Sequence, residues 1–228
     1  VGRRRVRMGV GDGASGAEGE AAADLDARIA PVTNATLANL AGTPIRVRGG
    51  IAVGGNAPLD FNRLRVDASK LSLALDGSVL SGAEAPSSEW QMHCAIYEAF
   101  PEAQGIVHAH SDFATALAVM KREIPPFHYM VAVAGGRDIR CAPYATFGSA
   151  ELAAHAVAAL DGRRASLLAH HGQIAFGESV EAALHLAHEV ETLAAQYWRA
   201  LQLGEPELLS DEEMAVNVEK FRTYGRRG

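Results

Sequence analysis

The chain has 228 residues, 48% of them hydrophobic, which is enough for one domain that buries a substantial core. Its net charge of −6 argues against nucleic-acid binding, and no apolar run approaches the roughly 20 residues that cross a membrane. The cysteines, Cys94 and Cys141, form no CxxC pair, which is typical of a reducing, cytoplasmic protein rather than a disulfide scaffold.

The early part of the chain divides into a weakly patterned segment and a strand-rich one. Residues 1–30 are rich in Gly, Ala and Glu, so we expect a poorly ordered or divergent N-terminal segment. Residues 31–228 are expected to form a single domain with a C-terminal tail. Within it, residues 45–53 and 71–80 carry short β-type runs, and their Gly-Gly and Asp-Gly pairs predict hairpin turns.

From Pro86 onward, helix caps alternate with apolar runs. The predicted helices lie within residues 86–100, 111–123, 149–160, 180–204 and 210–225. Predicted strands cover residues 105–110 and two pieces within residues 165–177, which flank a tight turn. This order predicts a three-layer α/β/α fold with helices on both faces of a mostly antiparallel central sheet.

Two histidine pairs follow the predicted strands. His108 and His110 are two residues apart, so in a strand both rings point to one face. Adjacent strand residues point to opposite faces, so only one of His170 and His171 should reach the same point. Three imidazoles and a carboxylate are suitable ligands for zinc, although unrelated histidines in the core and on the surface would give the same sequence pattern.

Glu89 is the candidate carboxylate. It lies about one turn into a predicted helix whose start carries Ser87 and Ser88. Hydroxyls and unpaired N–H groups at a helix N-terminus are suited to binding a phosphate, although an ordinary cap followed by an acid has the same pattern. His93 lies four residues after Glu89, on the same helix face, and is expected to be a core residue or to support the site.

Several motifs of the chain resemble the class II aldolase/adducin family: "PSSEW", "VHAH", "IPPFHYMVAVAGG", "CAPYATFGS" and "LLAHHGQIA". The resemblance runs from about residue 64 to residue 224. It implies one zinc ion per chain, bound by His108, His110, His171 and Glu89. It also implies that Ser87 and Ser88 bind the substrate phosphate.

Further roles follow from the same resemblance. Tyr129 matches a catalytic tyrosine that reaches into the site of a neighbouring subunit, so a homotetramer with sites at subunit interfaces is implied. Phe147, Phe221 and Tyr224 match aromatic residues around the aldehyde pocket, and Tyr224 is included among the catalytic candidates.

The first sixty residues depart from the family pattern. The family has a Gly-Thr-x-Gly-Asn loop and a Thr-Pro-Thr-Gly turn that donate hydrogen bonds to the phosphate. Here only Asn39 and Gly55 (or Asn56) stand in comparable contexts. Divergence, truncation or a shifted reading frame would each explain this departure.

The resemblance implies a zinc-dependent lyase. It would cleave a ketose 1-phosphate such as L-fuculose 1-phosphate, in fucose degradation, to dihydroxyacetone phosphate and lactaldehyde. No lysine falls within the motifs, which argues against a Schiff-base aldolase. The alternatives are a sister activity on the same scaffold (a pentulose-phosphate 4-epimerase or a sugar-phosphate dehydratase) and a non-catalytic, adducin-like assembly module.

Overall fold

The computed structural model describes residues 88–222 in full, the backbone of residue 223, and before residue 88 only the backbone of short strands. These strands are β1 (Asn34–Ala38), β2 (Pro44–Arg46), β3 (Gly50–Val53), β4 (Leu71–Ala74) and β5 (Val79–Gly82). The helices that follow are α2 (Trp90–Ala99), α3 (Asp112–Val119), the 3₁₀ helix η1 (Tyr129–Ala134), α4 (Ala150–Ala159), α5 (Val180–Leu203) and α6 (Asp211–Thr223). The later strands are β6 (Gly105–Ala109), β7 (Cys141–Ala142), β8 (Ala165–Leu168) and β9 (Gly172–Gly177).

The central sheet has the strand order β3-β6-β9-β8-β7. Its three middle strands pair antiparallel, whereas β3 and β7, at the two edges, run parallel to their neighbours. The sheet is therefore mixed, and only its centre matches the mostly antiparallel sheet that the sequence predicts. A second sheet, with the order β2-β1-β4-β5, is formed by the early strands.

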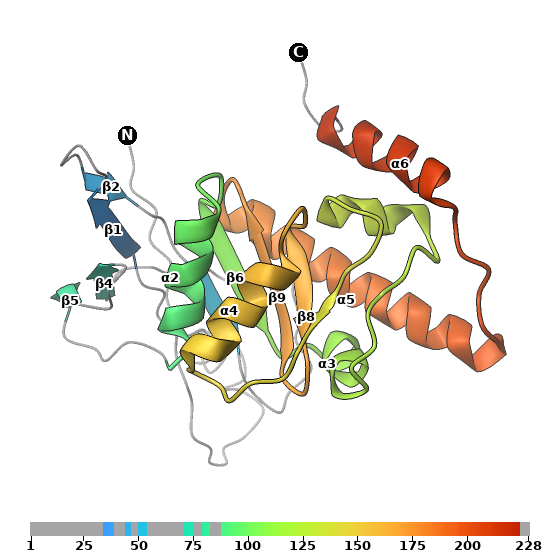
Figure 1. Ribbon diagram of the computed structural model, residues 1–228, viewed down its shortest axis with the longest axis horizontal. Helices are drawn as coiled ribbons and strands as arrows, with labels where there is room; N and C mark the ends of the chain where they lie inside the picture. Colours follow the sequence, from blue (N-terminus) through green and yellow to red (C-terminus); the bar gives the residue numbers. More distant parts are fainter. Residues whose placement is uncertain are drawn as a thin grey trace, which may run out of the picture.

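Helices cover both faces of the central sheet, so the predicted three-layer α/β/α fold is confirmed (Figure 1). Successive side chains of each strand point to opposite faces of the sheet, because side chains alternate along a β-strand. Ile106 and Ile174 pack with α2 and α4, while Val107 and Ala175 pack with α3 and α5. Both β6 and β9 are buried along their whole length, which explains why they are largely apolar, with His108 and Gln173 as buried polar exceptions.

Serine side chains cap three helices in the described part of the chain. Ser149 Oγ accepts from Leu152 N, and Ser179 Oγ accepts from Ala182 N. Ser210 and Glu213 form a reciprocal capping box at the start of α6. Of the serines that the sequence indicates as caps, Ser210 is confirmed, whereas Ser111 accepts no hydrogen bond from α3, and Glu89 is the N-cap residue of α2 in place of Ser87 or Ser88. No helix in the described part of the chain is both long and apolar enough to cross a membrane.

One of the two predicted hairpins is wrong. Strands β2 and β3 flank the Gly-Gly pair, but β2 pairs with β1 and β3 pairs with β6, in different sheets. Strand β3 thus pairs in parallel with β6, more than fifty residues away, instead of with its neighbour β2. The other prediction holds, because β4 and β5 pair antiparallel across the Asp-Gly segment.

Candidate metal centre

His108 is the buried anchor of the candidate site. It lies near the end of β6 with 1% of its surface exposed, and its Nδ1 is 2.8 Å from the backbone carbonyl of Gln173. A carbonyl oxygen only accepts, so Nδ1 carries the proton and Nε2 offers a lone pair. Metal-binding histidines have this arrangement, in which the outer ring nitrogen donates to a carbonyl.

The three histidines that the sequence singles out converge. His108 Nε2 lies 3.1 Å from His110 Nε2 and 3.1 Å from His171 Nε2. In the described part of the chain, these three residues form a group whose ligand atoms all lie within 4.8 Å of one another. Nitrogen ligands around a tetrahedral zinc ion are about 3.3 Å apart, so the cluster is suited to such an ion.

The physical reason for this convergence differs from the one that the sequence suggested. His110 follows the last residue of β6, and His171 lies in the turn between β8 and β9, so strand alternation positions neither of them. The turn depends on His170, whose φ of 57° is left-handed. His170 itself is exposed and packs edge-on against Tyr144 at 5.7 Å, outside the cluster.

Gly172 allows the turn to pass close to the end of β6. A Cβ atom at this position would lie 2.4 Å from the carbonyl oxygen of Ala109 and 2.9 Å from His110 Cδ2. Any side chain would therefore displace the backbone and ring that build the cluster. The glycine is required here for space, not for a special backbone conformation.

The electrostatics of the cluster favour neutral rings. Burial, followed by the neighbouring His171 and His110, holds the pKa of His108 well below its usual value. Burial, followed by His110, lowers the pKa of His171 to about 4, and burial also lowers that of His110. All three imidazoles are thus unprotonated near pH 7, which is the form that binds a metal.

Glu89 lies at a different helix position from the one expected. It is the N-cap residue of α2, immediately before the helix, rather than one turn inside it. Burial raises the pKa of Glu89, and a hydrogen bond from the Gly148 backbone opposes that shift. It is not a member of the three-histidine group. Its role as a fourth ligand therefore stays a prediction.

The expected phosphate residues fall largely outside the described part of the chain. This applies to Ser87, Asn39 and Gly55, and also to Tyr224. Ser88 is described and is exposed in the turn before α2. Gly148, with a φ of 72°, lies so close that a Cβ atom there would be 2.8 Å from the carbonyl oxygen of Ser88.

The aromatic candidates lie on the surface. Tyr129 begins η1, is 50% exposed and stacks on Phe221 of α6 with ring centres 6.5 Å apart. Phe147 is 67% exposed in the loop before α4. Both rings are therefore open to solvent in the single chain.

His93 has a closer link to the site than its sequence position reveals. It is fully buried on α2, and neither ring nitrogen has a hydrogen-bond partner among the described residues. Burial lowers the pKa of His93 to about 3, and His93 contributes to the lowered pKa of His108. The prediction that it is a core residue or supports the site is consistent with this placement.

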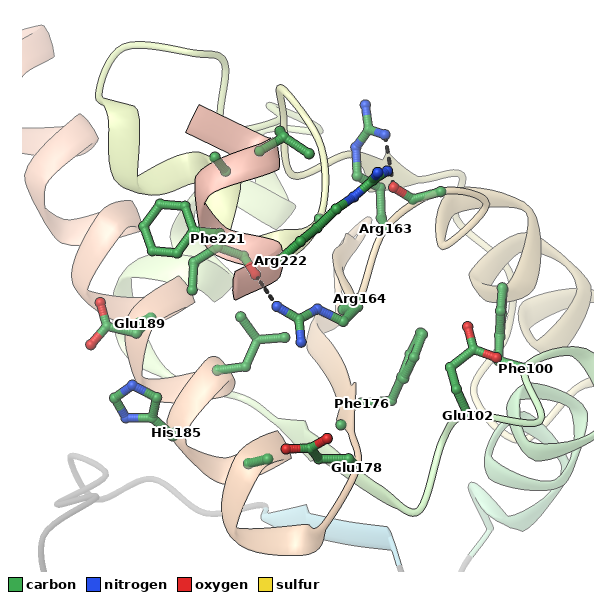
Figure 2. Close-up of a pocket in the computed structure, with 18 of the residues that line it drawn as sticks. Phe100, Glu102, Arg163, Arg164, Phe176, Glu178, His185, Glu189, Phe221 and Arg222 are labelled. Atoms are coloured by element: carbon green, nitrogen blue, oxygen red, sulfur yellow. Dashed lines mark hydrogen bonds between the residues drawn. The ribbon is translucent and has the colours of Figure 1, made fainter. Parts of the chain in front are cut away.

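A separate hollow of about 1060 Å³ lies between η1, the sheet, α5 and α6 (Figure 2). Two of its arginines are already engaged: Arg163 with Asp138, and Arg164 with the Val133 carbonyl. Phe221 also lines it, beside Tyr129. None of the three clustered histidines does, so the hollow is distinct from the metal centre.

Comparisons with known proteins agree with the resemblance. The family model for the class II aldolase and adducin N-terminal domain matches residues 56–198. A 5-methylthioribulose-1-phosphate/5-deoxyribulose-1-phosphate aldolase of Rhodospirillum rubrum is 57% identical over 144 residues, 63% of this chain and 65% of that protein. The L-fuculose phosphate aldolase of Escherichia coli K12 is 53% identical over 143 residues, 62% of this chain and 66% of that protein.

These matches span slightly less than two thirds of the relatives' own lengths. Among solved structures, an L-fuculose 1-phosphate aldolase superimposes with a TM-score of 0.63 at 45% identity. That superposition covers 65% of this chain and 70% of the other.

Proposed function

Because the chain belongs to the class II aldolase and adducin N-terminal domain family, we propose that it is a metal-dependent aldolase. It cleaves a ketose 1-phosphate into dihydroxyacetone phosphate and an aldehyde. The observation that carries this proposal is the convergence of three neutral Nε2 atoms at the end of a buried strand. Three unprotonated nitrogens that converge on one point are in the form that binds a metal ion.

The ion is zinc, bound by His108, His110 and His171 with Glu89 as the fourth ligand in the resting site. Three nitrogens and one carboxylate form a common zinc ligand set, and the fixed Nδ1–H of His108 supports it. When bound, the ion acts as a Lewis acid that polarises the substrate carbonyl.

Glu89 and Tyr129 move the two protons that the reaction requires. Cleavage breaks the C3–C4 bond, removes the proton from the C4 hydroxyl oxygen and delivers a proton to C3. The raised pKa of Glu89 suits it to exchange a proton with C3. The phenol of Tyr129, from a neighbouring copy, exchanges its proton with the C4 oxygen.

The start of α2 binds the phosphate. Ser88 lies directly before the N-cap residue Glu89, and the first N–H groups of a helix attract anions. Ser87 supplies the second hydroxyl, and Asn39 and Gly55 supply donors from the early segment. This location sets the phosphate beside the carboxylate that serves C3.

A second copy of the chain completes the site. Tyr129 is half exposed, and Phe147 is two-thirds exposed, so neither contributes to a closed pocket alone. A homotetramer with sites at the subunit interfaces would cover these rings, and Phe147, Phe221 and Tyr224 would surround the aldehyde end of the substrate.

Two substrates are supported by specific observations. L-Fuculose 1-phosphate is supported by the motifs and by the relative at 53% identity. A 5-deoxy- or 5-methylthio-ribulose 1-phosphate is favoured by the relative at 57% identity. The substrates share the dihydroxyacetone phosphate half and differ in the aldehyde. The aromatic residues around the aldehyde would therefore distinguish one substrate from another.

The decisive test is aldol cleavage of both sugar phosphates by zinc-loaded and zinc-depleted protein, with each product measured separately. The proposal requires zinc-dependent formation of dihydroxyacetone phosphate. Lactaldehyde identifies the fuculose substrate, and acetaldehyde or methylthioacetaldehyde identifies the other. Epimerised or dehydrated products without dihydroxyacetone phosphate would instead establish a sister activity. Protein that binds no zinc and transforms neither substrate would favour an assembly module.

A further inference from the structure

Ser111 occupies the N-cap position of α3, but its side chain makes no capping hydrogen bond. It follows His110, precedes α3 and is almost fully buried, yet its side chain accepts no hydrogen bond from the first turn. Glu191 of α5 takes that role, because its carboxylate accepts from the backbone N–H groups of Phe113 and Ala114, each at 2.9 Å. A carboxylate at a helix N-terminus is stabilised there.

The hydroxyl of Ser111 is thereby available for other bonds. It donates to Glu191 Oε2 at 2.6 Å and accepts from Gln173 Nε2 at 2.7 Å. The second hydrogen of that amide is donated to the carbonyl of Ala187 on α5, at 3.1 Å. The side chain of Gln173 is therefore fixed from two sides in a fully buried location.

Gln173 in turn fixes a histidine. Its backbone carbonyl, opposite Ala109 in the β6–β9 register, is the acceptor for His108 Nδ1 at 2.8 Å. Hydrogen bonds thus connect Glu191 to Ser111, Ser111 to the side chain of Gln173, and the backbone carbonyl of Gln173 to His108, with the covalent bonds of Gln173 joining the last two steps. Gln173 and Glu191 lie far from the histidines in the sequence, whereas Ser111 is covalently next to His110.

We propose that Glu191, Ser111 and Gln173 form a positioning relay that holds His108 and His110 in their metal-binding orientation. The proposal rests on the function above only in taking these histidines as metal ligands. Loss of one member leaves a buried donor or acceptor unpaired, which the structure relieves by shifting β9 or the start of α3. Either shift moves a ligand.

The test compares relay variants with a matched cap variant. Ser111→Ala removes the central hydroxyl, Gln173→Met removes the amide at similar length, and Glu191→Gln alters the remote end. Ser179→Ala serves as the control, because it removes the serine that caps α5 at Ala182 N. Zinc affinity of the full chain is measured by competition with a coloured chelator, and unfolding midpoints are measured without metal.

Removing an outer partner of a metal ligand ordinarily lowers metal affinity about 10- to 100-fold. We expect such losses for the three relay variants and an unchanged affinity for Ser179→Ala, whatever its unfolding midpoint. Nitrogen-15 NMR of the metal-free histidine side chains provides a second readout. The Nδ1-protonated form of His108 should be the single tautomer in the starting protein and mixed in folded Gln173→Met.

Relay variants that lose stability but retain both the zinc affinity and the single His108 tautomer would overturn the proposal. A starting protein that binds no zinc would overturn it as well. Zinc binding that responds to the relay, in protein that cleaves no sugar phosphate, would sustain the relay and refute the proposed aldolase function.

Discussion

The histidine cluster and the aromatic residues around Tyr129 contrast in how the fold holds them. The cluster belongs to one chain, with His108 buried and all its ligand atoms within 4.8 Å of one another. Tyr129 and Phe221 stack on each other at the surface, where Tyr129 is half exposed. A metal requires ligands that are already oriented, whereas a substrate pocket can be completed by a neighbouring copy. The predictions below test that difference.

The largest effect is expected from removing a ligand. His108→Ala and His171→Ala should lose zinc affinity on the order of 10²- to 10³-fold, since four ligands share a binding free energy of about 10–16 kcal/mol. Aldol cleavage should fall to the level of metal-free protein. The control is His170→Asn, because His170 lies outside the cluster and asparagine tolerates the left-handed backbone of this turn. The assignment is wrong if that control loses zinc while His171→Ala retains it.

Glu89→Gln should separate metal binding from proton transfer. The amide keeps the shape of the side chain but accepts no proton, and three histidines remain to hold the ion. Exchange of the C3 proton of dihydroxyacetone phosphate should fall by about 10²- to 10⁴-fold at unchanged zinc content. Isotope loss and metal content are measured on one sample. Normal exchange by a zinc-loaded variant would leave Glu89 at most a ligand.

Tyr129→Phe should lower cleavage by about 10²-fold without changing zinc content, since only a proton carrier is lost. If the tyrosine serves a neighbouring site, mixing this variant with Glu89→Gln should restore part of the activity through interfaces that carry neither defect. The matched control mixes each variant with itself. Failure to recover activity after verified subunit exchange would indicate that each chain is self-sufficient.

The smallest effect concerns His93, behind the cluster. Its pKa falls from 6.5 to about 3 on burial, so the unfolded chain binds the extra proton as the pH drops below 6.5. Burial of the neutral His93 ring therefore lowers the free energy of unfolding by about 1.4 kcal/mol for each pH unit as the pH falls from 6.5 towards 3. His93→Leu should remove that share of the slope, and Met92→Leu, at a buried position of α2 that carries no titratable group, should not. Urea unfolding of chelated protein at pH 7, 6 and 5 measures both, and equal slopes in the two variants would contradict the assignment.

Much of the fold and the cluster could be predicted from sequence because the signals are local. The cap at Ser210 and the apolar runs of β6 and β9 are read from neighbouring residues. The failed hairpin shows the limit. Strand β3 pairs in parallel with β6, and a short run of apolar residues does not specify a distant partner.

The candidate site shows the same limit in finer detail. The sequence favours His171 over His170, but by strand alternation, whereas a left-handed turn at His170 is what positions His171. The anchor of His108 is a backbone carbonyl, which every residue possesses and no motif marks. Glu191 is likewise hidden, because its partners lie nearly eighty residues away.

The register between β6 and β9 has a consequence for folding. His108 lies opposite Ile174, and a slip of two residues would leave every side chain on its own face. Burial of apolar surface alone therefore discriminates poorly against such a misaligned isomer. It would carry His108 about 7 Å along the strand, away from His171. A metal ion held by the three histidines would stabilise only the correctly aligned form, and it would thereby favour the native strand pairing during refolding.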